Sequence, residues 1–184
     1  MSSPSKKRRP RYAASPGTSP GTSPGTLLLR EVPAHAGAPG ARIIGPALEH
    51  VLREAPAARC RLYVLTDLGR PAGAAPLAAA LLETGAPRHV PEWALLHALT
   101  VAVPHRGRGL GRRLLDDLLM ELRADGVRAV WFLPGAGDDG LRALLESAGF
   151  RDDTDRGLSR ENERTYGYDE PEIRPWAAWL SREL

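Results

Sequence analysis

The stretch Val103–Leu115 reads VPHRGRGLGRRLL and places three glycines and four arginines between a strand-like segment and a helical one. Before it, Pro91–Val103 is a long apolar run whose β-branched end favours a strand. After it, leucines recur at helical spacing, at residues 110, 114, 115, 118, 119 and 122. A strand that turns through glycines into a helix directs several backbone N–H groups at one point, where a phosphate group can bind. We therefore expect an anion-binding loop over residues 106–111.

Two common phosphate-binding motifs do not fit this stretch. A P-loop requires lysine and then serine or threonine after its last glycine, whereas Gly111 is followed by Arg112 and Arg113. A dinucleotide-binding fingerprint that begins at Gly107 would have Arg112 at its sixth position, where a small residue is needed. It also lacks an acidic residue at the end of a strand about twenty residues further on.

The composition is that of a soluble globular protein, with 42% hydrophobic and 26% charged residues. The sequence contains no apolar run near the ~18 residues that span a bilayer, so we expect no membrane association. The single cysteine, Cys60, excludes an intramolecular disulfide and a cysteine-based zinc cluster. We therefore expect a cytoplasmic protein without a metal site.

The N-terminal segment differs from the rest of the chain. Residues 1–25 are basic and then rich in Ser, Pro, Gly and Thr, which predicts a disordered tail ahead of a single domain at residues 26–184. The first 26 residues carry a charge of +5, so the remainder carries −2 of the net +3. The charge of −2 outside the tail argues against a nucleic-acid-binding domain. The basic tail could still make a weak contact with nucleic acid.

The order of the expected elements indicates an α/β fold. Strands are expected at residues 26–32, 61–67, 75–84 and 127–133, and a further strand within residues 163–170. Helices are expected from Pro46, from Leu110, and over a segment with Leu141, Leu144, Leu145 and Ala148 on one face. Because meandering strands precede a strand–helix–strand unit, the sheet should be mixed and flanked by helices.

The spacing Arg106-x-x-Gly109-x-Gly111 resembles the Arg/Gln-x-x-Gly-x-Gly/Ala signature of the GNAT family of N-acetyltransferases. Leu99–Val101 is similar to the fourth strand of that family, Val127–Leu133 to its fifth strand, and Leu141–Phe150 to the helix that ends in Gly-Phe. The resemblance covers roughly residues 26–150 and is specific over residues 99–122. It implies a central sheet that is mostly antiparallel.

The resemblance also implies that acetyl-CoA is the co-substrate, without a metal, and that a primary amine of a small molecule or a protein attacks it directly. The diphosphate would bind at the loop, and the pantetheine arm would lie along the edge of the preceding strand. A backbone N–H near Val101 would polarise the thioester carbonyl. The residues expected to contact acetyl-CoA are Leu99, Val101, Val103, Arg106, Gly107, Arg108, Gly109, Leu110, Gly111 and Arg112.

The general base has several candidates. Glu92 and His97 lie on or beside the fourth strand, where enzymes of this family often hold a base. Their odd spacing would place them on opposite faces of a regular strand, so at most one would face the acceptor. Glu83, at the end of the preceding strand, is a third candidate.

The chain departs from the family pattern at the position expected for the general acid. Many relatives have a tyrosine four residues before the glycine of the Gly-Phe pair, where this chain has Leu145. Tyr166 or Tyr168 could replace that tyrosine. The departure leaves an alternative function open, a non-catalytic CoA-binding regulatory module whose basic tail contacts nucleic acid or an acidic partner. The sequence leaves the oligomeric state open as well, a homodimer included.

Overall fold

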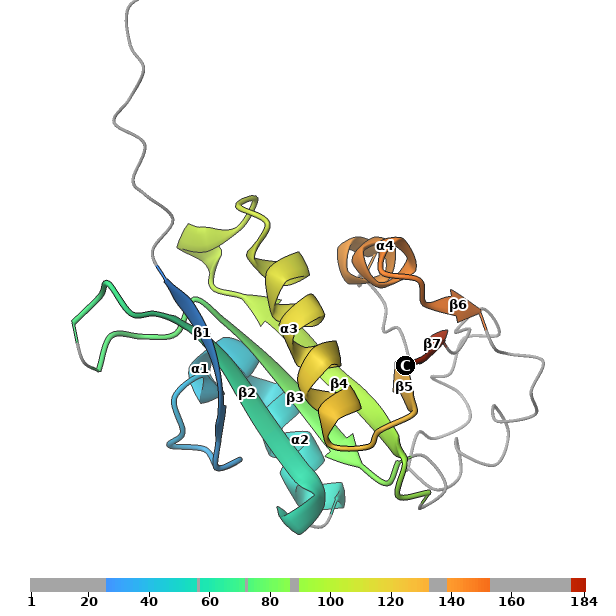
Figure 1. Cartoon of the computed structure of the whole chain (residues 1–184). Helices are drawn as coiled ribbons and strands as arrows, with labels where there is room; N and C mark the ends of the chain where they lie inside the picture. Colours follow the sequence, from blue (N-terminus) through green and yellow to red (C-terminus); the bar gives the residue numbers. More distant parts are fainter. Residues whose placement is uncertain (1–25, 56, 72, 87–89, 133–138, 153–179) are drawn as a thin grey trace, which may run out of the picture.

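The computed structural model of the protein describes residues 26–55, 57–71, 73–86, 90–132, 139–152 and 180–184. In this part of the chain, seven strands form one sheet in the order β1-β2-β3-β4-β5-β7-β6 (Figure 1). Only β4 and β5 are parallel, and the other neighbours are antiparallel, which confirms the mixed and mostly antiparallel sheet. The strands are β1 Leu27–Val32, β2 Cys60–Asp67, β3 Ala78–Thr84, β4 Trp93–Val101, β5 Ala129–Phe132, β6 Arg151–Asp152 and β7 Leu180–Glu183.

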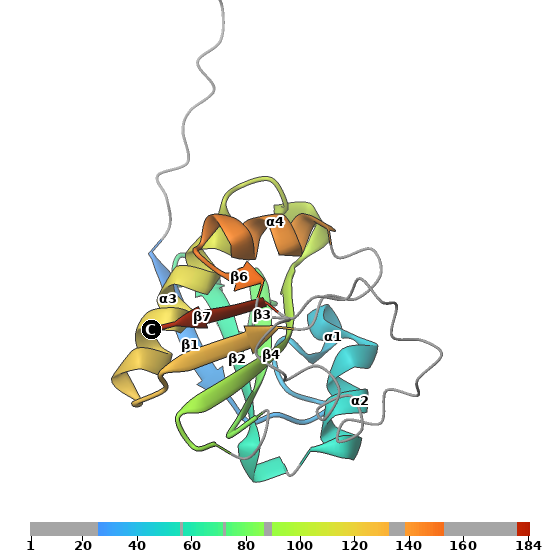
Figure 2. The same ribbon diagram turned by 90° about the vertical axis from the view of Figure 1, so that its right-hand side faces the viewer.

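Helices cover both faces of this sheet. The α-helices are α1 Ala41–Ile44, α2 Pro46–Glu54, α3 Leu110–Ala124 and α4 Asp139–Ser147. Two short 3₁₀ helices, Ala57–Arg59 and Val103–His105, precede β2 and follow β4. Figures 1 and 2 show α3 on one face of the sheet, and α1 with α2 on the other. The α/β architecture expected from the sequence is therefore present.

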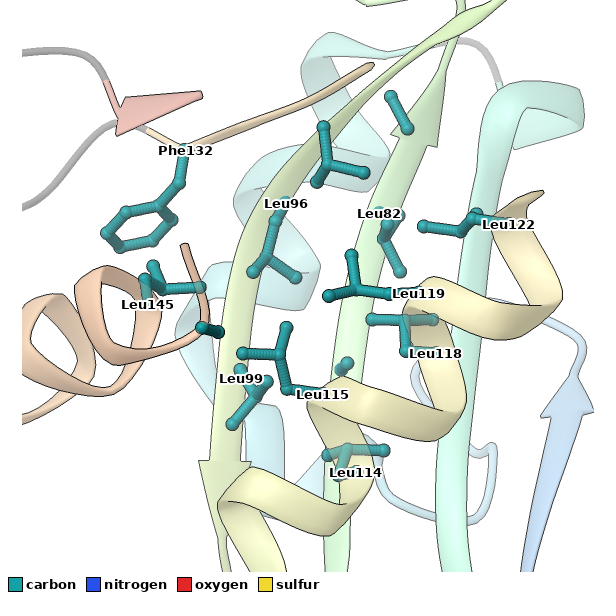
Figure 3. Close-up of a cluster of buried hydrophobic side chains, with 14 of the residues drawn as sticks. Leu82, Leu96, Leu99, Leu114, Leu115, Leu118, Leu119, Leu122, Phe132 and Leu145 are labelled. Atoms are coloured by element: carbon teal, nitrogen blue, oxygen red, sulfur yellow. The ribbon is translucent and has the colours of Figure 1, made fainter. Parts of the chain in front are cut away.

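The leucine repeat of α3 forms the larger hydrophobic core. Leu114, Leu115, Leu118 and Leu122 are fully buried against the sheet, where Leu96 is one of the side chains they meet (Figure 3). The opposite face of the sheet packs against α1 and α2 through a second core of Ile44, Leu48, Val51, Leu62, Val64 and Leu81. Successive side chains of β2 and β3 point to opposite faces of the sheet, so these two strands contribute residues to both cores.

Gly40, the residue before α1, lies in close contact with the sheet. Its φ is +89°, and a Cβ atom added there would lie 2.6 Å from Cγ1 of Val64 and 3.2 Å from Cβ of Ala79. Glycine is therefore needed both for the backbone conformation and for the close approach. This contact places the start of α1 close to β2 and β3.

The C-terminal part of the sheet was not anticipated from the sequence. The strand expected within residues 163–170, the N-terminal tail at residues 1–25 and the last residue of the strand expected at 127–133 all lie outside the described residues. The structure instead places β7 at Leu180–Glu183, paired with β5 on one side and with β6 on the other.

Candidate functional site

The glycine-rich loop lies between the end of β4 and the start of α3. Gly107 and Gly109 have φ values of +72° and +74°, a region that favours glycine. A Cβ atom added at either glycine would meet nothing within 4 Å. Both glycines are thus required by the backbone, and the space beyond each of them is open.

The start of α3 presents a row of backbone donors. The first helical hydrogen bond runs from the N–H of Arg113 to the carbonyl of Gly109, and no side chain caps the helix. Within the described residues, the N–H groups of residues 107–112 donate to no protein acceptor. Unpaired donors at a helix N-terminus, where the helix dipole is positive, attract anions. The loop predicted from the sequence therefore has the donors that a diphosphate needs.

The arginine side chains of the loop divide into those with a protein partner and one without. Nε of Arg106 donates to the main-chain oxygen of Val101 over 3.1 Å, which connects the loop to the end of β4. The exposed guanidinium of Arg108 has no partner among the described residues. Arg108 is thus the loop cation that is available to a bound anion.

The two arginines of the first turn of α3 are engaged with the protein. Nε of Arg112 lies 2.9 Å from both carboxylate oxygens of Asp116, and Nη1 lies 3.3 Å from the main-chain oxygen of Ser147 at the end of α4. Nε of Arg113 lies 2.7 Å from Asp117. Arg112 is expected from the sequence to contact acetyl-CoA, and the structure leaves its backbone N–H, rather than its paired guanidinium, free for that contact.

Gly111 packs the first turn of α3 against β4 and α4. A Cβ atom added there would lie 3.4 Å from Leu144, 3.5 Å from Val101 and 3.8 Å from Leu99. These are ordinary van der Waals distances, so a methyl group would fit, and only a side chain larger than that of alanine would push the helix away from the strand. Gly111 thus marks where the first turn of α3 lies against β4 and α4.

One edge of β4 becomes open beyond Leu96. Residues 93–96 pair with β5, whereas residues 98–101 pair with β3 alone within the described part of the chain. Leu99 and Val101, two residues expected to contact acetyl-CoA, lie on this open length. Val103 lies beyond it, in the 3₁₀ helix, and its side chain is 70% exposed. An extended ligand can add to such an edge in the manner of a further strand.

His97 lies where β4 leaves β5. The pairing of β3 with β4 shifts there, because Leu82 faces Leu96 while Leu81 faces Ala98, so His97 has no residue opposite it. A β-bulge of this kind turns the strand and re-aims its side chains. The strand is therefore not regular, which removes the basis for assigning faces by odd and even spacing along its whole length.

The side chain of His97 meets Glu83 on β3. Nε2 of His97 lies 3.2 Å from Oε2 of Glu83, and the two side chains are 10% and 3% exposed. Glu92, in contrast, is exposed in the turn before β4, where its carbonyl accepts the N–H of Arg128 at 2.6 Å. The structure thus brings two of the three base candidates together and holds the third apart.

Cys60 lies next to this pair, opposite Glu83 in the pairing of β2 with β3. Burial, and then the charge of the Glu83 carboxylate, raise the pKa of the Cys60 thiol above its ordinary value. A thiol with a raised pKa stays protonated near neutral pH and is a poor nucleophile. Cys60 is therefore a core residue rather than a reactive one.

Among known protein families, a family model described as Acetyltransferase (GNAT) family matches residues 43–150 of the 184. The chain belongs to the GNAT acetyltransferase family. The match includes the glycine-rich loop, α3 and the Gly149-Phe150 pair, which are the segments that carry the resemblance in the sequence. No match was found among curated proteins.

Solved structures of other acetyltransferases share the fold of this GNAT chain. An acetyltransferase from Thermus thermophilus is 27% identical, with a TM-score of 0.57 over 86% of this chain and 97% of the other. An IAA acetyltransferase from Bacillus cereus ATCC 14579 is 19% identical, with a TM-score of 0.59 over 86% and 100%. A GNAT family acetyltransferase from Elizabethkingia anophelis, solved with acetyl-CoA bound, is 17% identical, with a TM-score of 0.58 over 86% and 98%.

Leu145 of this GNAT chain is a core residue. Its side chain is fully buried, and Figure 3 shows it near Phe132 and on the side of α4 that faces the sheet. A leucine cannot donate a proton, so this position provides no general acid. The two tyrosines considered as replacements, Tyr166 and Tyr168, lie outside the described residues.

No helix among the described residues has both the length and the apolar character to cross a membrane. Likewise, this part of the GNAT chain has no cluster of three or more His, Cys, Asp or Glu side chains that could hold a metal ion.

Proposed function

We propose that the protein is an N-acetyltransferase that transfers the acetyl group of acetyl-CoA to a primary amine by direct attack. The observation that carries this proposal is the row of unpaired N–H groups at residues 107–112, which fits the diphosphate of CoA. The guanidinium of Arg108 adds a positive charge beside these donors. Family membership makes acetyl transfer the reaction to test first.

The position of the loop relative to β4 supports acetyl-CoA over a simple phosphate. An arm that starts at the loop and follows the open edge of β4 passes from Val101 to His97. The four steps between these two residues span about 13 Å at about 3.3 Å per residue. The thioester would then lie near the bulge, and main-chain groups at residues 98–101 would hold the pantetheine arm as a strand holds its neighbour.

We assign the general base to His97 rather than to Glu92. His97 lies at the bulge, where the open edge of β4 begins, whereas Glu92 lies five residues away before the start of the strand. A general base must come within hydrogen-bond reach of the proton that it removes. For Glu92 that requirement would move the thioester to the part of β4 that pairs with β5.

His97 takes one proton from the ammonium group of the acceptor, and the free amine then forms the new N–C bond while the C–S bond breaks. The sulfur leaves with the electron pair as a thiolate and takes up one proton from solvent. The His97 imidazolium and the attacking nitrogen each release one proton to solvent, so the products are the amide, the CoA thiol and one proton.

The experiment is an acetylation assay with a panel of small amines and lysine-containing peptides. We expect release of CoA thiol that depends on the amine, with acetylated product detected by mass spectrometry. The His97→Gln variant should lose about 10²- to 10⁴-fold in kcat, the usual contribution of a general base, with acetyl-CoA affinity unchanged. Tight acetyl-CoA binding without thiol release from any amine would instead favour the non-catalytic CoA-binding module.

We also infer the domain boundaries and the acceptor class. We propose that residues 26–184 form one catalytic domain, since the sheet includes both β1 near the start of this range and β7 at its end. The amine can belong to a small molecule or to a protein. The cytoplasmic location, the nucleic-acid contact of the tail and the oligomeric state stay predictions from the sequence.

A further inference from the structure

Glu83 is a buried carboxylate near the end of β3, among mostly apolar buried side chains of the sheet. Among the residues whose side chains are described, it is the one charged residue that is buried, at 2% exposure. Its strand neighbour Leu82 and its cross-strand partner Leu95 are apolar and buried. Burial of a carboxylate costs free energy unless the group is paired. The partner that the structure gives it is Nε2 of His97.

The pairing of β3 with β4 makes this contact possible. Glu83 faces Leu95, and His97 is two residues further along β4, so the two side chains are diagonal neighbours on one face of the sheet. The bulge leaves no β3 residue opposite His97, so the imidazole has room to lean toward the carboxylate. The contact therefore depends on the register of two strands that are joined by a loop.

The contact links the tautomer of His97 to the charge of Glu83, because the 3.2 Å distance fits either direction of the hydrogen bond. An ionised carboxylate can only accept hydrogen bonds, so with Glu83 ionised Nε2 of His97 is the donor. A neutral imidazole has one N–H group, so Nδ1 then has a lone pair and no proton. The neighbouring Cys60 thiol is neutral and brings no competing charge to the carboxylate.

We propose that Glu83 is a positioning residue, which holds His97 in the Nε2–H tautomer and so makes Nδ1 the atom that accepts the proton of the amine. The inference rests on the proposed function, because it concerns the base of that reaction. When Nδ1 takes the proton from the ammonium group, the ring becomes an imidazolium and keeps its Nε2–H bond to the Glu83 carboxylate. The carboxylate stays ionised throughout and stabilises the positive charge.

The first test measures the tautomer and does not need activity. The full chain is labelled with ¹⁵N-histidine, and two-bond ¹H–¹⁵N correlation spectra identify the protonated nitrogen of each neutral ring. The His97→Gln spectrum identifies the His97 signals by their loss. We expect the Nε2–H tautomer in the unmodified protein. Glu83→Leu should give a mixture of tautomers, whereas Glu121→Gln, on the exposed surface of α3, should leave the spectrum of His97 unchanged.

The second test is kinetic. Glu83→Gln provides both a donor and an acceptor, so the carboxamide can donate to Nε2 and allow the unproductive tautomer. We expect kcat to fall at least about tenfold, as a weakened general base predicts, with the KM for acetyl-CoA unchanged. In the His97→Gln background, Glu83→Gln should cause no further loss, because a positioning residue acts through the base. A purely structural role would lower both backgrounds alike.

The outcomes separate this inference from the proposed function. If His97 keeps the Nε2–H tautomer in a folded Glu83→Leu protein, or if the two substitutions are additive, Glu83 does not position the ring, even when acetyl transfer is intact. If no amine is acetylated but the tautomer changes with Glu83, the positioning by Glu83 is established and the proposed reaction fails. Acetyl-CoA affinity, measured for each variant, shows that the fold is retained.

Discussion

Nε of Arg106 donates a hydrogen bond to the main-chain oxygen of Val101 over 3.1 Å, which joins the first arginine of the glycine-rich loop to the last residue of β4. The glycine-rich loop, where we expect the diphosphate to bind, and the strand edge that would hold the pantetheine arm are thereby held as one unit. The same loop directs the N–H groups of residues 107–112 away from any described protein acceptor.

Gly109→Asp should abolish binding of acetyl-CoA. A carboxylate at this position would repel the phosphates, and its side chain would occupy the open space beside the loop. Any side chain at this φ of +74° strains the backbone by about 1–2 kcal/mol, which is too little to account for the result by loss of the fold. Calorimetry should show at least about a tenfold rise in Kd, which corresponds to about 1.4 kcal/mol.

Gly126→Asp is the matched control for that substitution. Gly126 lies just after the other end of α3, has a φ of +84° and would also place its Cβ atom in open space. It therefore carries the same backbone strain without a contact to the loop. Unchanged acetyl-CoA affinity in a folded Gly109→Asp protein would show that the diphosphate binds elsewhere.

Arg108→Ala should weaken CoA binding, because this guanidinium is the loop cation without a described protein partner. A hydrogen bond to a charged group contributes about 1.5–3 kcal/mol, so Kd should rise by a factor of about 10 to 100. The loss should shrink as salt concentration increases. Arg123→Ala, at the far end of α3, should leave Kd unchanged. Equal effects of the two substitutions would indicate a general effect of net charge.

Gly40→Ala should destabilise the fold more than Gly45→Ala. Both residues have positive φ values, +89° and +66°, so an alanine at either site costs about 1 kcal/mol of backbone strain. At Gly40 the new methyl group would also clash with Val64, at 2.6 Å, whereas at Gly45 it would meet nothing. Overpacking adds about 1–3 kcal/mol, which denaturant unfolding of the two variants should resolve. Equal losses would mean that the segment before α1 moves off the sheet without cost.

kcat should rise with pH from about pH 6 to pH 10 and show no alkaline fall. Leu145 is buried and supplies no general acid, and a thiol with a pKa of about 8.5 leaves as a thiolate near neutral pH. The acceptor ammonium, with a pKa of about 10.4 for a lysine-like amine, is harder to deprotonate, so its deprotonation should dominate the profile. The measurement runs from about pH 6 to pH 10, with stability checked at both ends.

A bell-shaped profile would contradict that expectation. If its alkaline limb disappears in Tyr166→Phe or Tyr168→Phe, the substituted tyrosine is the general acid that replaces the missing one. If the limb persists in both variants, the acid lies elsewhere in the chain.

Local patterns in the sequence predicted the larger part of the fold. The glycine-rich loop, the leucine repeat of α3 and the first five strands were all placed correctly, because glycine conformation and side-chain periodicity act over neighbouring residues. β7 is different. Residues 180–184 read LSREL and carry no alternating pattern, so their strand conformation comes from pairing with β5 and β6.

The glycine-rich loop, as a predicted anion-binding site, and the absence of a tyrosine at Leu145 could both be read from the chain. Both depend on residue type and short spacing, which a chain carries before it folds. The tertiary structure alone decided that Arg112 is paired with Asp116 and Ser147, that Arg108 is left available, and that Glu83 meets His97. The reason is physical: Glu83 and His97 are fourteen residues apart, and their contact exists only where antiparallel pairing and a β-bulge set the register of β3 against β4.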